Sequence, residues 1–208
     1  MITMALSETQ RAKTAEAALK ILETQGWSGL SLPAVAAAAG LKLADFYPAR
    51  GVERVLAWID QGLDRAATAR VDPALSPRDR LFEAVMARFD AMEARRPAHR
   101  ALEAGIEHDV DHQLQRGARR LRTAAWLLAA CGINASGFSG AARAAAFAHA
   151  LALAQEGWRA DEDGGLAKTM AALDAGLRRM ERWGLLPNAA PPETPAPQHP
   201  AADAEKSG

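Results

Sequence analysis

The sequence predicts an all-α protein, and three observations support this fold class. Alanine is abundant, whereas the chain of 208 residues has a single tyrosine and few β-branched residues. Alanine has the highest helix propensity and strands favour β-branched and aromatic residues, so this composition favours helices. Apolar residues also recur at helical spacing in stretches separated by Gly, Pro and Asn, which is typical of amphipathic helices joined by short turns.

The N-terminal part is expected to form three helices, over residues 9–25, 32–39 and 43–47. Gly26 and Gly40 follow the first two helices as C-terminal stops. Ser31 is placed to cap the second helix, and Pro33 lies in its first turn, where a missing N–H costs little. Pro48 cannot donate a helical hydrogen bond and is expected to end the third helix.

A longer fourth helix is expected over residues 52–70, followed by a linker with two prolines over residues 71–77. Apolar spacing then predicts helices over residues 77–95, 98–110, 114–130, 139–159 and 166–183. From residue 187 onward small polar residues, Pro and Ala predict a disordered tail. We therefore expect a head (residues 1–56), a body (57–186) and a tail (187–208).

Charge and cysteine content limit the function classes. The chain has 25 basic and 25 acidic residues, and this neutrality weakens the case for a nucleic-acid binder without excluding one. The lone Cys131 rules out an internal disulfide and argues against a cysteine metal site. We find neither an apolar run long enough to span a membrane nor a secretory signal, so a cytoplasmic location is expected.

One cluster has residue types found in metal and catalytic sites: Glu107, His108, Asp109, Asp111 and His112. The two histidines would share a helical face only if a helix continued through the cluster, and the glutamate arrangement of zinc proteases is absent. A solvated charged turn is the favoured interpretation. Because nucleophile, phosphate-loop and Rossmann motifs are also absent, we expect no catalytic residue, no metal and no cofactor, hence a protein that is not an enzyme.

The spacing of the second and third helices is typical of a helix-turn-helix, with a small residue at Ala36 and a turn at Gly40. This part resembles the head of the TetR family of transcription regulators. Gly26 and Trp27 follow the first helix as in that family, Ser31 caps the next, and residues 39–47 (AGLKLADFY) align without a gap on its Ala-Gly-Val-x-x-x-x-Leu-Tyr run.

The resemblance implies that the head binds operator DNA. It implies that Ser31 and Tyr47 contact phosphates and that Lys42 and Ala44 face the major groove. Arg50 does not align with the backbone-binding lysine of the family, but it lies near that position and is a candidate to compensate for its absence. Contacts with phosphates position such a head, whereas contacts with base edges give sequence specificity.

Two acidic residues depart from the family pattern. Glu53 stands where the family commonly has a lysine that holds the DNA backbone, and Asp45 adds a negative charge to the expected recognition helix. Residues 1–56 have six basic and five acidic side chains, a net charge of +1. Since affinity for the DNA backbone depends on the number of phosphates neutralised, weak DNA binding or none is expected from these departures.

TetR-type bodies enclose a ligand and pair through a four-helix contact. By this resemblance the helices over residues 139–159 and 166–183 are expected to form a homodimer interface. Bulky or soft side chains that could line a pocket for a small hydrophobic ligand are Phe89, Met92, Trp126, Phe147 and Trp158. For each of them, a place in the plain core is the favoured interpretation.

A second family of the same shape, the lipid-binding accessory proteins of coenzyme Q biosynthesis, is similar in two short stretches. These are residues 51–59 (GVERVLAWI) and 77–89 (PRDRLFEAVMARF), and this similarity accounts for Glu53. The favoured interpretation is a TetR-type homodimeric regulator that responds to a small hydrophobic ligand. A lipid-binding accessory protein that does not bind DNA is the alternative, and a helical adaptor that binds neither is a third possibility.

Overall fold

The computed structural model describes residues 6–47, 51–69, 71–162 and 164–187, and within them it contains helices and no strand. The predicted all-α class is therefore confirmed. In chain order the helices are α1 (Glu8–Gln25), η1 (Trp27–Gly29), α2 (Leu32–Ala39), η2 (Leu43–Phe46), α3 (Glu53–Thr68), α4 (Pro77–Glu93), α5 (Arg96–Glu107), α6 (Val110–Ala130), α7 (Gly137–Ala160) and α8 (Ala167–Arg182). The two η elements are 3₁₀-helices.

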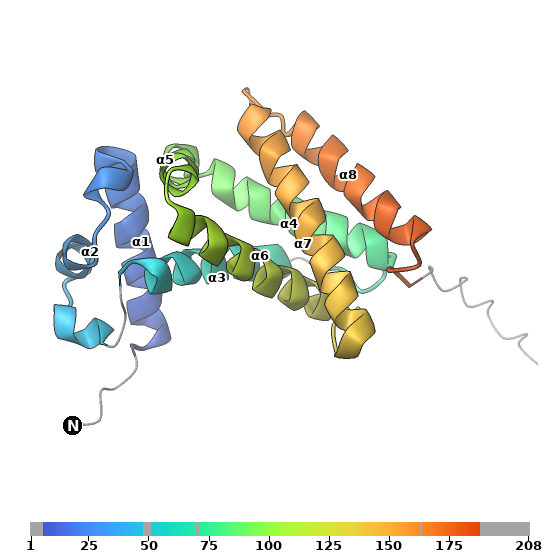
Figure 1. Cartoon of the computed structure of the whole chain (residues 1–208), viewed down its shortest axis with the longest axis horizontal. Helices are drawn as coiled ribbons and strands as arrows, with labels where there is room; N and C mark the ends of the chain where they lie inside the picture. Colours follow the sequence, from blue (N-terminus) through green and yellow to red (C-terminus); the bar gives the residue numbers. More distant parts are fainter. Residues whose placement is uncertain (1–5, 48–50, 70, 163, 188–208) are drawn as a thin grey trace, which may run out of the picture.

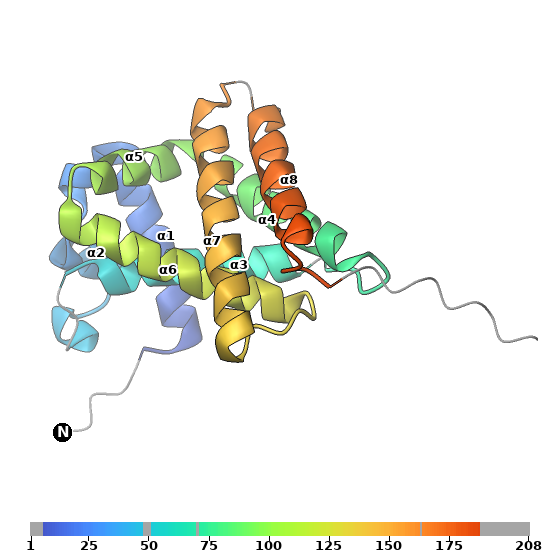
Figure 2. The same ribbon diagram turned by 45° about the vertical axis from the view of Figure 1, so that its right-hand side comes forward.

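Helix α3 runs from one end of the molecule into the other (Figures 1 and 2). At one end it packs on α1, which also contacts α2 and α5; further along it packs on α4 and α6. The antiparallel pair α7 and α8 lies at the opposite end, against α6 and α4. The boundary expected between residues 56 and 57 therefore falls inside a continuous helix that belongs to both parts.

The helix ends in the first part follow from local capping chemistry. The Ser7 hydroxyl accepts from the Gln10 N–H at 3.2 Å at the start of α1. The expected cap at Ser31 is confirmed, because its hydroxyl accepts from the Ala34 N–H at 3.3 Å. Gly40 ends α2 at φ 66°, a left-handed conformation that glycine adopts without steric cost.

The third expected helix is shorter than predicted. Residues 43–46 form one turn of 3₁₀-helix, η2, instead of an α-helix reaching residue 47. Tyr47 has an extended conformation with ψ 137°, as steric contact with the ring of a following proline requires, and Pro48 follows it in the sequence. The carboxylate of Asp45 accepts the Lys42 N–H at 2.9 Å and so closes the start of this turn.

The break between α5 and α6 lies closer to the N-terminus than expected. The sequence predicted a helix over residues 98–110 and a second from 114, whereas α5 ends at Glu107 and α6 begins at Val110. Asp109 caps α6 by accepting the His112 N–H at 3.1 Å. An aspartate at the N-cap can start a helix at once, without the longer turn that the charged residues suggested.

Small residues bring α7 and α8 close together. A Cβ atom added at Gly176 would lie 2.6 Å from the Cβ of Ala150 on α7. Asp161, between the helices, caps α8 by accepting the N–H groups of Lys168 and Thr169, both at 3.0 Å. None of the described helices is long and apolar enough to cross a membrane.

A tight contact between Gly105 and Trp27 joins α5 to the first part of the molecule. A Cβ atom at Gly105 would lie 2.1 Å from Cγ of Trp27. We expect Gly105→Ala to lower the free energy of unfolding by about 1–3 kcal/mol, the usual cost of overpacking. Chemical denaturation measures this change.

Gly117→Ala on α6 is the matched control, since nothing lies within 4 Å of the added Cβ atom. In this exposed helical position the same substitution should stabilise the protein by about 0.5–1 kcal/mol. Equal effects of the two substitutions would contradict the contact described here.

Candidate functional site

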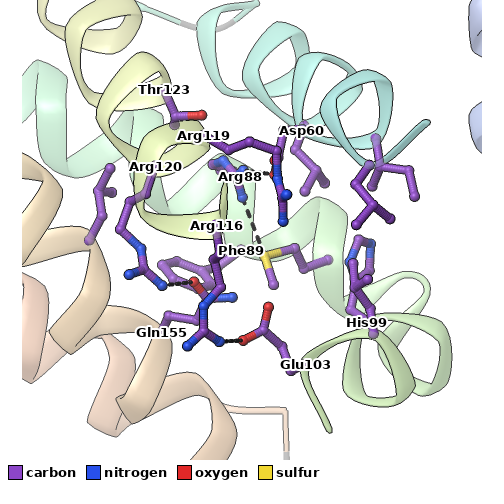
Figure 3. A pocket seen from close by; sticks show the side chains of 16 residues that line it. Asp60, Arg88, Phe89, His99, Glu103, Arg116, Arg119, Arg120, Thr123 and Gln155 are labelled. Carbon is purple, nitrogen blue, oxygen red and sulfur yellow. Dashed lines mark hydrogen bonds and ion pairs between the residues drawn. The ribbon is translucent and has the colours of Figure 1, made fainter. Parts of the chain in front are cut away.

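A partly open cavity of about 60 Å³ is lined by residues of α3, α4, α5, α6 and α7. Figure 3 shows how charged side chains from these helices meet around it. The polar lining consists of Asp60, Arg88, His99, Glu103, Arg116, Arg119, Arg120, Thr123 and Gln155. The apolar lining consists of Leu56, Ile59, Leu63, Phe89, Met92, Leu102 and Leu151. Four arginines in one small cavity make the site rich in hydrogen-bond donors.

At one end of the cavity, Asp60 of α3 bridges two arginines. One carboxylate oxygen accepts from Nη2 of Arg88 at 2.8 Å, and the other accepts from Nε of Arg119 at 3.0 Å. The Arg88 and Arg119 side chains are only 13% and 6% exposed. Three helices, α3, α4 and α6, are thus joined through a single carboxylate in a poorly solvated environment, where ion pairs are screened little.

Asp64, one turn further along α3, extends this cluster. It accepts from Nε of Arg88 at 3.0 Å and from the Thr123 hydroxyl at 2.9 Å. Burial raises the pKa of Asp64, although Arg88 opposes the rise. Burial also opposes the charged form of Arg88, but Asp60 and Asp64 outweigh it and the pKa of Arg88 is raised. The guanidinium therefore stays charged and holds both carboxylates.

Glu53 faces the body and not the surface expected to bind DNA. Its carboxylate pairs with Arg119, and its other oxygen lies 3.6 Å from Nε2 of His112. The side chain is 17% exposed. The repulsion of phosphate expected at this position is therefore not supported: the negative charge is held by an arginine of α6.

At the opposite end of the cavity, two arginines of α6 have weaker partners. Arg116 donates to Glu103 at 2.9 Å, whereas Arg120 donates to the neutral amide oxygen of Gln155 at 3.0 Å. Arg120 has no ion-pair partner within the part of the chain that the structure describes. Burial lowers the pKa of Arg120 with help from Arg116, and burial raises the pKa of Glu103. This end therefore has an excess of positive charge.

His99 on α5 is a polar group inside the cavity lining without a protein partner. It is 2% exposed, and its ring donates to and accepts from none of the described residues. Burial, followed by the charge of Arg88, lowers the pKa of His99 to about 4. The ring is therefore neutral at pH 7, with one donor and one acceptor nitrogen that form no hydrogen bond with the described residues.

The residues expected to line a ligand pocket are not brought together. Phe89 and Met92 line the cavity, whereas Trp126 lines a separate groove of about 430 Å³ between α1, α3 and α6. Phe147 and Trp158 are fully buried in the core away from both. Nine of the sixteen residues that line the cavity are polar or charged, which differs from the mostly apolar lining that the sequence suggested.

The residues expected to contact DNA lie on one exposed segment. Ser31, Lys42, Ala44 and Tyr47 are all exposed, and Tyr47 reaches 71% exposure. Arg50 lies outside the described residues. The charged turn expected at residues 107–112 is in part a helix cap, and the described residues contain no group of side chains that could hold a metal.

The charged cluster around Asp60 was missed from the sequence, although a pattern for it exists. Asp60 and Asp64 occur at helical spacing beside the apolar residues of α3, and Arg116, Arg119 and Arg120 share one side of α6. Such a pattern predicts a buried ion pair only when the two helices are known to be in contact. The sequence alone does not show that contact.

Comparisons of the chain with protein-family models, with curated proteins and with solved structures found no match.

The bridging role of Asp60 makes it the residue of the cluster most sensitive to substitution. Asp60→Asn removes the charge shared by Arg88 and Arg119 while keeping the side-chain size. We expect the free energy of unfolding to fall by about 2–3 kcal/mol, because Arg88 and Arg119 would each lose one of two carboxylate partners in a poorly solvated environment. Urea denaturation at pH 7 measures the loss.

Glu8→Gln provides the comparison, because it removes the partner of Arg65 in a pair whose side chains are 76% and 48% exposed. Exposed pairs contribute about 0–1 kcal/mol. A loss for Asp60→Asn no larger than that for Glu8→Gln would show that the buried cluster does not hold the helices together.

Proposed function

We propose that this chain is a TetR-like, homodimeric DNA-binding regulator whose cavity receives a small effector. The observation that supports this function most is the course of α3. The helix starts a few residues after η2, the segment proposed to enter the major groove, and it forms a wall of the cavity through Leu56, Ile59 and Asp60. One rigid element would then respond to both ligands.

The surface chemistry of the first part is compatible with phosphate contacts. Lys42 and Tyr47 are exposed at the two ends of η2, and Ser31 is exposed at the start of α2. The two acidic residues that were expected to weaken DNA binding both have partners within the protein. Asp45 accepts the Lys42 N–H, and Glu53 pairs with Arg119. The short η2 would present few base contacts, so we expect phosphate contacts to supply most of the affinity.

The cluster around Asp60 gives a physical route from effector to DNA. Arg119 holds both Glu53, at the first turn of α3, and Asp60, two turns further on. An effector that binds more tightly to one arrangement of these ion pairs shifts the equilibrium between two positions of α3. Because the coupling is reciprocal, DNA changes the affinity for the effector by the same factor as the effector changes the affinity for DNA. In the proposed function this coupling regulates the attached head.

The cavity does not favour the lipid-binding alternative. Ligand pockets for drug-sized molecules commonly measure about 300–1,000 Å³, far more than the roughly 60 Å³ present here. A long isoprenoid would also remove water from arginines without pairing their charges, which is costly in a buried site. A small polar effector is therefore preferred.

An apolar surface on α7 and α8 supports the proposed dimer. Phe138 and Leu153 on α7 are 94% and 36% exposed, with exposed Ala145 between them, and Met170 on α8 is 38% exposed. Large exposed apolar residues on a packed helix pair are typical of a surface that another protein covers. A second copy would bury them in a symmetric contact.

DNA binding is tested with duplexes from the region upstream of the gene that encodes the chain, by fluorescence anisotropy at several salt concentrations. We expect saturable binding that weakens steeply with salt. Lys42→Ala and Tyr47→Phe should each reduce affinity about tenfold, and Lys42→Ala should lower the salt slope by about 1.

Lys168→Ala on α8 removes the same charge far from η2 and should leave affinity unchanged. Failure to bind any duplex at low salt, or equal losses for Lys42→Ala and Lys168→Ala, would refute the proposed DNA contact. Copurification of an isoprenoid lipid with a protein that binds no DNA would favour the alternative function.

The dimer is tested by placing a charge in the middle of the α7 surface. Ala145→Glu should raise the dimer dissociation constant at least about tenfold, because the interface would bury an unpaired carboxylate. Sedimentation equilibrium measures the change. Ala118→Glu, at an exposed position of α6, should leave the wild-type association intact; a monomeric wild-type protein would contradict the proposal.

A further inference from the structure

The cavity end formed by Arg116, Arg120 and Gln155 lies apart from the Asp60 cluster (Figure 3). The two arginines around Asp60, Arg88 and Arg119, pair with three carboxylates, those of Asp60, Asp64 and Glu53. At the other end Glu103 supplies one negative charge against two guanidinium groups, and it pairs with Arg116 alone. Arg120 is left with an amide oxygen. The surplus at this end is therefore one positive charge.

We propose that this end binds a small organic monocarboxylate, with the carboxylate held by Arg120 beside Arg116 and the apolar part against Phe89 and Leu151. A planar guanidinium offers two parallel N–H groups that match the two oxygens of a carboxylate. A single negative charge neutralises the surplus, whereas a dianion would overcompensate it. The inference rests on the proposed function for its effect on DNA, but the binding step itself does not.

The size of the cavity limits the ligand. A cavity needs a volume of about 10–15 Å³ to hold one water molecule. The roughly 60 Å³ present therefore accommodates a ligand of about four to six groups, each the size of a water molecule. A carboxylate with two or three carbons attached falls within this range. Fatty acids with long chains do not fit without displacement of a helix.

His99 is a second, independent indication that the cavity takes a ligand. Its ring is 2% exposed and lines the cavity, yet no described residue satisfies its nitrogens. The neutral ring can offer one donor and one acceptor nitrogen to water or to a polar atom of a ligand in the cavity. Hydrogen-bonding capacity is therefore available both at the arginines and at the α5 side of the same cavity.

The test uses propionate, propionamide and inorganic phosphate as probes of the full-length protein, without DNA, in isothermal titration calorimetry at pH 7. Propionamide has the shape of propionate without the charge. We expect propionate to bind with a dissociation constant of about 1 mM or tighter, a range consistent with so few atoms. Propionamide and phosphate should each bind at least about tenfold more weakly.

Arg120→Gln removes the charge but keeps hydrogen-bonding capacity, and it should weaken propionate binding at least about tenfold. Arg122→Gln, at an exposed position on the same helix that lines the outer groove and not the cavity, should bind propionate as the wild type does. Equal binding of propionate and propionamide, phosphate binding at least as tight as propionate, or wild-type affinity in Arg120→Gln would each overturn the proposal. If Arg120→Gln does not fold, the comparison of the three probes on the wild type still decides it.

Adding propionate to a preformed protein–DNA complex separates this inference from the proposed function. Selective propionate binding by a protein that never binds DNA would leave the carboxylate site standing and refute the regulator. DNA binding by a protein that shows no propionate binding in calorimetry would refute the carboxylate site and leave the proposed regulator standing.

Discussion

The shared carboxylate of Asp60 is the interaction on which the arrangement of the body depends. It holds Arg88 of α4 and Arg119 of α6 at the same time, so three helices meet at one partly buried charge. Taking these charges out of water is costly, and mutual pairing with additional hydrogen bonds compensates for it. Asp64 and Thr123 complete the pairing. The position of α3 between α4 and α6 is thereby fixed by chemistry as well as by apolar packing.

Two acidic residues of the first part, Glu53 and Asp45, form contacts within the protein. Glu53 is drawn toward Arg119, and Asp45 toward the backbone of its own 3₁₀ turn. The exposed side of η2 is left with Lys42, Ala44 and Tyr47. Net charge counted along the sequence gives equal weight to every ionisable group, whereas binding depends on those that remain available to a partner.

Most of the fold could be predicted from the sequence, because helices are specified by local apolar spacing and by caps such as Ser31 and Gly40. The errors lie where one residue changes a helix end: Pro48 shortens η2 through its effect on Tyr47, and Asp109 starts α6 early. The cavity could not be predicted in this way. Its lining comes from five helices, and whether Phe89 or Phe147 faces an empty space depends on how those helices pack.

The double role of Arg119 has a consequence for the evolution of a regulator of the proposed kind. This side chain pairs with Glu53 near the head and with Asp60 at the cavity. A substitution that adapts the cavity to a new effector would also alter the contact that holds α3 next to the head. The effector-binding cavity and the DNA-binding head could therefore not diversify independently. Descendants with new specificities would then acquire compensatory changes at Glu53 or Asp60, and these positions should co-vary among relatives.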